Sequence, residues 1–488
     1  MGYYLDRITR GLIDLGQAGL DLESILSRYG LNPTEKIFNY VAADLFRNAV
    51  EQGTDVKVHH FAHLSLPTDG EPILYIATEN NYVRRITRNT NVLVDNGTDG
   101  VLFLSSKYTA PFDIPDELVS DNGLIRSLIL DKIPFDMESL TREESEILLL
   151  GEIFALLMRD AIPDTKPIFA FIGEKGSGKT TAVRMFGRTL YGPTWDVIDI
   201  TEKVRDFDTL ISTDDFVCFD NADENVKWLN NKFAIAASGG KVVRNVLYKT
   251  HQQAEYPIIS MIAATSRTPC FRRDDVADRL VVLNTIRLER PDQSDFNADV
   301  LDEVLSKRKE LWGELIYHIQ AILKVLHEPD WRSIQVRGAR LQGFARFTVV
   351  VARALGCEKI AYKAWEKMKV VQREFAIEGE VLFDVLSEWV PVNQGREVTA
   401  GELAPELAGI AKNHKLDWPY NNGKSLGQKL SHLMADLKDI FDMSFCNCPT
   451  KKQMIYTFRP KGEPGINFDS GSIPEAIPGT QTGMNKGV

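Results

Sequence analysis

The chain has 488 residues, of which 44% are hydrophobic and 26% are charged, and its formal net charge is −11. No apolar run reaches the about 18 residues of a membrane-spanning helix, and the N-terminus lacks the basic and apolar segments of a secretory signal, so neither is expected. The acidic charge counts against a uniformly basic nucleic-acid binder, although such a site needs only local positive charge.

The cysteines are five in number and mostly far apart, which favours a reducing compartment and predicts a cytoplasmic protein. Cys446 and Cys448 could provide half of a zinc site, but no second pair of ligands lies nearby, so this interpretation is not favoured. The length fits roughly two to four domains.

Residues 1–135 are expected to form an N-terminal α+β module. Residues 1–50 have a helical pattern, and the stretch LDLESILSRYG ends at Gly30, which is typical of a helix C-terminus. Residues 55–110 contain short β-type runs separated by Asp-Gly and Asn-Gly pairs, as in hairpins. The histidines of HHFAH (59–63) could bind a metal, but alternation along one strand would place them on both faces, so a packed or solvated role is favoured.

Residues 136–330 are expected to form a nucleotide-binding α/β core. An apolar strand pattern, Ile168 to Ile172, leads into GEKGSGKTT, and a helix pattern follows. In this context the glycines allow backbone N–H groups to face phosphates, Lys179 binds the β- and γ-phosphates, and the Thr180 hydroxyl ligates Mg²⁺. A degenerate loop that binds nucleotide weakly is the alternative. The expected nucleotide-binding residues here are Gly173, Glu174, Lys175, Gly176, Ser177, Gly178, Lys179, Thr180 and Thr181.

A second apolar strand, FVCFD, ends at Asp220, which is expected to hold Mg²⁺ through water. Asn221 follows, where many ATPases have a glutamate that activates the attacking water. Either Asn221 orients the water, or Asp223 or Glu224 supplies the base, and the sequence leaves both possibilities open.

Two further strands carry candidate catalytic residues. The run YPIISMIAATS ends in Thr265 and Ser266, which could contact the γ-phosphate or cap a turn. Arg279 lies between DDVAD and the apolar strand LVVLNTI. It is a candidate for completing a neighbouring subunit's site, or it forms an ion pair with Asp275 or Asp278. Arg272 and Arg273 are the alternatives for the first role.

The stretch between these strands, SGGKVVRNVLYKTHQQAEY (238–256), has the alternation of a β-hairpin. It is locally basic, with no acid before Glu255, and it contains an aromatic residue that can stack on a base. A solvated hairpin with charged edges is the alternative. The expected single-stranded DNA contacts are Lys241, Arg244, Tyr248, Lys249 and His251.

The order of these motifs resembles AAA+ helicase cores of the superfamily 3 and minichromosome maintenance type. It is more similar to the ATPase half of primase–helicases of phages and mobile elements. The residues that carry the resemblance are GEKGSGKTT, FVCFDNAD, ASGGKVVRNVLYKT, RRDDVADRLVVL and RLQGFARF. The chain has no room for a primase domain, so polymerase activity is not implied.

This resemblance implies ATP and Mg²⁺ as cofactors, with Thr180 and Asp220 at the metal. The implied catalytic residues are Lys179, Asp220, Asn221, Thr265 as sensor 1 and Arg279 as the arginine finger of a hexameric ring. Arg340 would be a lid arginine that senses nucleotide, or else an ordinary surface arginine.

Residues 331–380 are expected to form a helical lid or connector, residues 381–462 a winged-helix domain, and residues 463–488 a disordered tail. Two helices, the second capped by Ser425 and continuing to Phe441, precede a hairpin around Pro449. Its expected DNA contacts are Lys429, Lys451 and Lys452, whereas protein binding is the alternative.

The sequence therefore predicts an α/β P-loop NTPase (AAA+) core with an N-terminal α+β module and a C-terminal winged-helix domain. The expected function is an ATP-dependent DNA helicase or translocase for replication of a phage or mobile element. The alternative is a regulatory or signalling ATPase, such as a defence or transposition switch, in which ATP controls assembly. Partners would be single-stranded or forked DNA, further copies of the chain and a replication protein, with no membrane.

Overall fold

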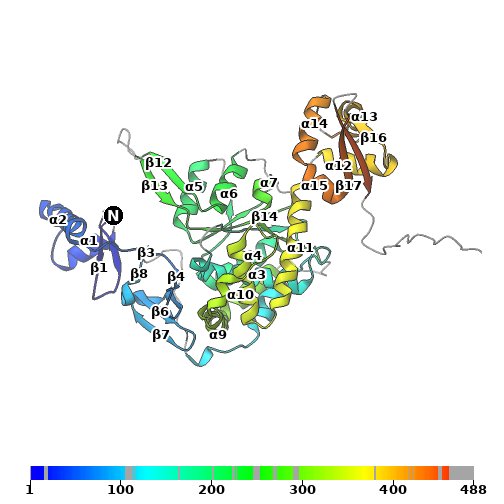
Figure 1. Ribbon diagram of the computed structural model, residues 1–488. Helices are drawn as coiled ribbons and strands as arrows, with labels where there is room; N and C mark the ends of the chain where they lie inside the picture. The colour runs from blue at the N-terminus through cyan, green and yellow to red at the C-terminus, as the bar shows by residue number, and fades with distance from the viewer. Residues whose placement is uncertain are drawn as a thin grey trace, which may run out of the picture. The chain divides into compact units, whose positions relative to one another are not determined.

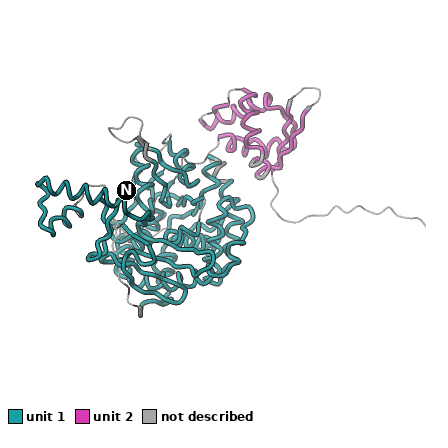
Figure 2. Tube along the Cα trace, turned by 60° about the vertical axis from the view of Figure 1, so that its left-hand side comes forward, with its two compact units in different colours: residues 1–377 teal, residues 378–488 magenta. Residues whose placement is uncertain are grey.

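The computed structural model divides into two compact units, residues 1–377 and residues 378–488 (Figure 2). The residues it describes are 2–15, 20–104, 114, 116–162, 165–200, 203–222, 226, 228–245, 253–267, 271, 273–288, 296–377, 381–416, 418–420, 422–448 and 453–460. Among the described helices, none combines the length and apolar character that crossing a membrane requires.

A parallel five-stranded sheet forms the centre of the first unit, in the order β10-β11-β14-β9-β15 (Figure 1). Its four longer strands are buried apolar runs, as expected where helices cover both faces of a parallel sheet. The mixed α/β core that the sequence predicts is therefore confirmed. The strands are β9 (Ile168–Ile172), β10 (Ile198–Asp199), β11 (Phe216–Asp220), β14 (Met261–Ser266) and β15 (Leu280–Asn284).

Helices connect these strands and pack around the sheet. Helix α3 begins with a reciprocal cap, in which Glu144 N–H donates to Thr141 Oγ1 and Thr141 N–H to Glu144 Oε2. A Cβ on Gly151 would lie 2.9 Å from Thr348 Oγ1, so glycine lets α3 and α10 approach closely. The helices of this core are α3 (Arg142–Leu157), α4 (Lys179–Tyr191), α5 (Val204–Thr213), α6 (Leu229–Ala237), α7 (Asp274–Ala277), α8 (Phe296–Ser306), α9 (Arg308–His327), α10 (Gln342–Ala354) and α11 (Glu358–Ile377).

The N-terminal segment precedes this core and contains more β-structure than its sequence pattern indicates. A hairpin of β1 (Tyr3–Leu5) and β2 (Leu12–Asp14) comes before the helices α1 (Leu20–Arg28) and α2 (Lys36–Gln52), so the helical prediction for residues 1–50 is wrong at its start. A four-stranded antiparallel meander follows, with β3 and β8 paired beside it. These strands are β3 (Val58–His59), β4 (Ala62–Ser65), β5 (Ile73–Ala77), β6 (Tyr82–Ile86), β7 (Asn91–Asp95) and β8 (Leu102–Phe103).

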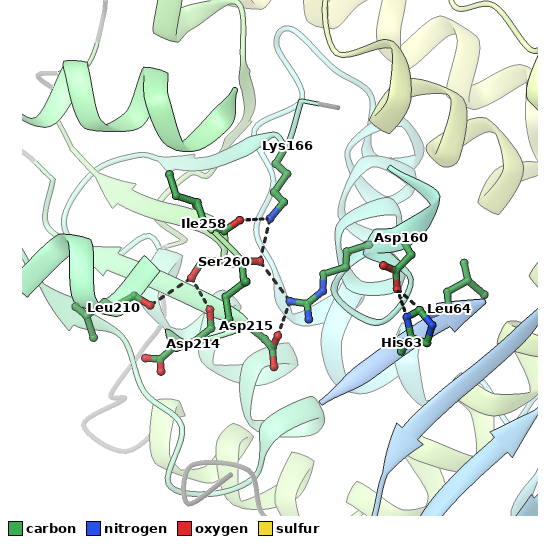
Figure 3. A network of polar contacts seen from close by, with 11 residues as sticks. His63, Leu64, Asp160, Lys166, Leu210, Asp214, Asp215, Ile258 and Ser260 are labelled. Carbon is green, nitrogen blue, oxygen red and sulfur yellow. Dashed lines mark hydrogen bonds and ion pairs between the residues drawn. The ribbon is translucent and has the colours of Figure 1, made fainter. Parts of the chain in front are cut away.

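The histidines of HHFAH do not alternate along one strand, contrary to expectation. His59 ends β3 and His63 lies in β4, and their rings stack with centroids 3.8 Å apart. His63 Nδ1 lies 3.0 Å from Asp160 Oδ2, a contact visible in Figure 3. Burial, together with the neighbouring His63, lowers the pKa of His59 to about 3. The favoured packed role fits His59, which is only 7% exposed.

His59 should make the stability of the chain depend on pH. The folded chain keeps His59 neutral down to a pKa of about 3, whereas an unfolded histidine titrates near 6.5. The unfolded state therefore takes up the proton first, and the stabilisation present above pH 6.5 is lost as the pH falls toward 3. At pH 5 the loss is about 2 kcal/mol.

Urea denaturation at pH 7 and pH 5 measures this loss. The His59→Gln variant should lose less stability between the two values than the native chain does, and His60→Gln should behave like the native chain. An unchanged pH dependence in His59→Gln would assign the effect to other groups.

The second unit has its own core of apolar side chains, which include Leu382, Trp389, Leu426 and Phe458. Its three strands form an antiparallel sheet in the order β16-β18-β17. Asn422 rather than Ser425 caps α14, and the predicted helix to Phe441 is split in two at Leu433. The elements are α12 (Val381–Val392), β16 (Glu397–Thr399), α13 (Ala400–Asn413), α14 (Gly423–His432), α15 (Met434–Ile440), β17 (Phe441–Cys448) and β18 (Gln453–Pro460).

Candidate nucleotide-binding site

The glycine-rich loop joins β9 to α4 at the carboxyl edge of the parallel sheet. Gly176 and Gly178 have φ values of 84° and 83°, in the left-handed region that favours glycine. Gly178 is the N-cap of α4, so the loop leads directly into the N-terminus of a helix 13 residues long. The free N–H groups and the positive end of the helix dipole at such a terminus favour anions.

Gly173 begins the loop where two backbone segments nearly touch. A Cβ on this residue would lie 2.2 Å from the carbonyl oxygen of Thr285 and 2.8 Å from Ser177 Oγ. Ser177 Oγ in turn lies 2.8 Å from Thr285 Oγ1, and Thr285 Oγ1 donates to the Ile172 carbonyl at 3.2 Å. The buried Ser177 side chain thus anchors the loop to the end of β15, while its backbone remains part of the glycine-rich loop.

Replacing Gly173 by alanine should distort the loop, because a backbone oxygen cannot move aside as a flexible side chain can. The expected cost is about 2 kcal/mol of unfolding free energy, together with weaker nucleotide binding. Urea denaturation and titration with a fluorescent ATP analogue measure the two effects. Gly11→Ala is the matched control, since the nearest atoms to its Cβ would lie at an ordinary 3.4 Å. Native-like behaviour of both variants would contradict the steric argument.

Lys179 is the first residue of α4, and its ammonium group bends back over the loop. Its Nζ donates to the carbonyl oxygens of Gly173 at 2.6 Å and Glu174 at 2.8 Å. The side chain is therefore held at the mouth of the loop, where the same donors can bind phosphate oxygens.

Three oxygen-bearing side chains come together where β11 and β14 end and α4 begins. Thr180 Oγ1 donates to Asp220 Oδ1 at 2.9 Å, and Thr265 Oγ1 donates to the same oxygen. A carboxylate and a hydroxyl are ligands that Mg²⁺ prefers, so the Asp220 and Thr180 pair fits this ion. Parallel strands end at one edge of the sheet, which brings Asp220 and Thr265, 45 residues apart, into contact.

The backbone conformation at position 221 favours asparagine over the glutamate found there in many ATPases. The φ of Asn221 is 51°, in the left-handed region where asparagine is enriched and a longer side chain such as glutamate is disfavoured. Its N–H donates to Thr265 Oγ1 at 3.2 Å, so Asn221 belongs to the same network as Asp220. The alternative bases Asp223 and Glu224 lie outside the described residues.

Arg279 and Arg340 lie at the opposite edge of the sheet. The carbonyl of Arg279 accepts from the N–H of Ile168, the first residue of β9, whereas the loop follows the last residue of that strand. A strand of five residues spans about 16 Å. Within one chain, Arg279 is therefore separated from its own phosphate loop by the length of the sheet.

The arginines at this edge form a cluster with two aspartates. Arg340 Nη1 donates to Asp278 Oδ2 at 2.7 Å, and Arg279 donates to the carbonyl of Asp275. Burial, and then the Arg340 cation, lower the pKa of Arg279. The Nε atom of Arg279 is buried and has no hydrogen-bond partner. Arg273 pairs with Asp275, and Arg272 lies outside the described residues.

The sequence reasoning singled out neither Thr285 nor Arg287, two residues beside the loop. Thr285 anchors Ser177, and the Arg287 guanidinium would lie 3.7 Å from a Cβ on Gly176. Both follow β15, which pairs with the strand that leads into the loop. Their position after a parallel strand is the signal that could have identified them.

The predicted hairpin is present as β12 (Lys241–Asn245) and β13 (Gln253–Pro257), and it projects from the core beside α5 and α6 (Figure 1). Lys241 Nζ is 2.8 Å from Glu255 Oε2, so the one acid of the stretch is paired with a lysine. Tyr248, Lys249 and His251 lie outside the described residues, as does the side chain of Arg244.

In the second unit, Lys429 lies on α14, and Lys451 and Lys452 lie outside the described residues. A groove of about 750 Å³ runs along another face of α14 and is lined by Lys424, Gln428 and Ser431. Sequence reasoning did not single out this face.

Several solved structures, two of them described as helicases, are similar to this chain at low identity. An active helicase, Cch of SCCmec type IV, is 14% identical over 86% of this chain and 84% of its own, with a TM-score of 0.45. The NrS-1 C-terminal region is 10% identical over 78% and 94%, with a TM-score of 0.35. The JCV helicase is 11% identical over 48% and 66%, with a TM-score of 0.23. No protein-family model and no curated protein matches the sequence.

Proposed function

We propose that this chain is an ATP-driven DNA helicase or translocase that works as a ring of identical subunits. The observation that carries the proposal is the separation of the two halves of the site. Lys179, Thr180, Asp220 and Thr265 gather at the carboxyl edge of the sheet, and Arg279 lies at the amino edge. Head-to-tail contact between copies would bring the amino edge of one subunit to the loop of the next, and such contacts close into rings.

In this proposal the residues of the carboxyl edge hold Mg²⁺-ATP. The loop N–H groups and Lys179 bind the phosphates, while Thr180 and Asp220 hold the metal ion. Asn221 orients the attacking water, and Thr265 links the metal-side carboxylate to the end of β14. Arg279 of the neighbouring subunit stabilises the charge that develops on the transferred phosphoryl group, and Arg340, paired beside it with Asp278, supports it there.

The DNA-contacting elements of the proposal are the hairpin and the second unit. The hairpin projects from the core, and Lys241, Arg244, Tyr248, Lys249 and His251 would meet the backbone and bases of a single strand. The second unit has the element order helix, strand, three helices and a hairpin, in which the last two helices, α14 and α15, adjoin at Leu433. This order resembles that of winged helices, and Lys429, Lys451 and Lys452 would contact phosphates.

A regulatory ATPase, in which ATP controls assembly, is the second candidate. Asn221 favours it, because the left-handed backbone at this position disfavours the glutamate that would activate water. Slow turnover suits a switch better than a motor.

Measuring ATP hydrolysis with and without single-stranded DNA, at low and moderate salt, tests the proposal. A motor predicts a rise in turnover with DNA that weakens as salt increases, because phosphate contacts release counterions. It also predicts a ring-sized particle in native mass measurements, and unwinding of a forked duplex. Tight ATP binding with turnover that DNA does not change would favour the regulatory ATPase.

A further inference from the structure

A network of half-buried and buried charged groups contacts the base of the hairpin at the amino edge of the sheet, and Figure 3 shows its side chains. Lys166, two residues before β9, contacts both ends of the hairpin segment. Its N–H donates to the carbonyl of Ala237, the last residue of α6, at 2.9 Å. Its Nζ donates to the carbonyls of Ile258 at 3.1 Å and Ile259 at 2.9 Å, directly after β13.

A second cation, Arg159, connects one of these carbonyls, that of Ile259, to the segment just before the strand that carries Asp220. Arg159 Nη1 donates to the carbonyl of Ile259 at 3.3 Å and forms an ion pair with Asp215. The two side chains are 17% and 8% exposed, so water screens the pair little. Asp215 immediately precedes β11, and its carbonyl accepts from the N–H of Met261, which begins β14.

The network therefore connects three parts of the molecule through a few atoms. One is the hairpin base at Ile258 and Ile259, and another is the start of β11, whose far end is Asp220. The third is the N-terminal meander, because Asp160, next to Arg159, accepts from His63 and from the Leu64 N–H at 2.8 Å.

Desolvating two cations here is costly, whereas apolar side chains would fill the same space without that cost. Burial, with the Arg159 cation nearby, lowers the pKa of Lys166 to about 8. The cations, unlike apolar groups, donate directional hydrogen bonds to two particular carbonyl oxygens. These bonds fix the hairpin base relative to β11.

We infer that Lys166 and Arg159 are positioning residues that couple the nucleotide state of β11 to the position of the hairpin. The inference rests on the proposed function for its biological role. In physical terms, a shift of the strand ending at Asp220 is transmitted to Ile259 through the contacts of Asp215 and Arg159. Lys166 meanwhile holds the two ends of the hairpin segment together.

The test compares Lys166→Met, which removes the donors and keeps a side chain of similar length, with Lys166→Arg, which keeps a cation. Lys367→Met is the matched control, because Lys367 is likewise a hydrogen-bonded lysine, paired with the buried carboxylate of Glu144, and its contact among the described residues is not with the hairpin. All variants are made in the full chain. Hydrogen exchange of residues 238–260 is measured with ADP and with a slowly hydrolysed ATP analogue, beside ATP turnover with and without oligo-dT.

The expected result has two parts. Hydrogen exchange of the hairpin differs between the two nucleotides in the native chain and in the Lys166→Arg and Lys367→Met variants. In Lys166→Met this difference is lost. DNA stimulation falls by about 5-fold or more in Lys166→Met, while turnover without DNA changes by less than about 2-fold.

Three outcomes overturn the inference. The first is hairpin exchange in the native chain that is the same with both nucleotides. The second is a Lys166→Met variant whose exchange still differs between the nucleotides as in the native chain. The third is an equal loss of turnover with and without DNA in Lys166→Met. A fourth result would separate the inference from the proposed function. If DNA does not stimulate the native chain, but its hairpin exchange depends on the nucleotide and Lys166→Met removes that dependence, the coupling is supported. Only the proposed DNA function is then contradicted.

Discussion

Replacing Lys179 by alanine is expected to lower ATP turnover by about 100-fold or more, because one preorganised cation at developing phosphate charge is worth that much. The ammonium group already lies at the mouth of the loop, held by two carbonyl oxygens. Without it, the loop N–H groups alone would bind the phosphates in the proposed site. Turnover at saturating ATP, measured by phosphate release, gives the size of the effect.

Lys175→Ala is the control for this substitution. Lys175 belongs to the same loop, but its side chain is exposed. Its removal should change turnover by less than about 3-fold while the backbone contribution stays. Equal losses in the two variants would mean that the charge of the whole loop, rather than the position of Lys179, matters.

Replacing Arg279 by alanine is expected to lower turnover by about 1,000-fold while ATP binding stays nearly intact. The physical reason is the place of Arg279 at the amino edge of the sheet, where it is a strand's length from the loop of its own chain. In the proposed ring, Arg279 would therefore act on the ATP of a neighbouring copy. Fluorescent nucleotide binding and phosphate release, measured on the same preparation, separate the two effects.

Mixing two inactive variants tests whether Arg279 acts between subunits. An interface between the intact loop of an Arg279→Ala subunit and the intact arginine of a Lys179→Ala subunit is complete. In a random one-to-one mixture about a quarter of the interfaces are of this kind, so turnover should recover to that extent. Arg205→Ala, an exposed arginine on α5, should stay fully active. Failure of the mixture to recover would indicate that Arg279 stabilises its own chain instead.

Local patterns were sufficient for the parts of the fold that depend on near neighbours in sequence. The strand before the loop, the loop and the helix after it follow one another within 24 residues, and the structure has them as β9, loop and α4. The same holds for the hairpin at residues 241–257. Periodicity was less reliable where caps decide the boundary, as at Asn422, and where a bend divides a short run between strands of two different sheets, as at HHFAH.

The sequence by itself determined that this chain has a glycine-rich loop between a strand and a helix, an apolar strand ending in Asp220 and a basic hairpin, because each depends on residue types at fixed short spacings. Only the tertiary structure decided which of these residues meet. The parallel sheet brings Thr265 onto Asp220 and moves Arg279 to the far edge, and chain folding brings Lys166 under both ends of the hairpin. Strand order and register arise from packing between segments far apart in sequence, so no local pattern contains them.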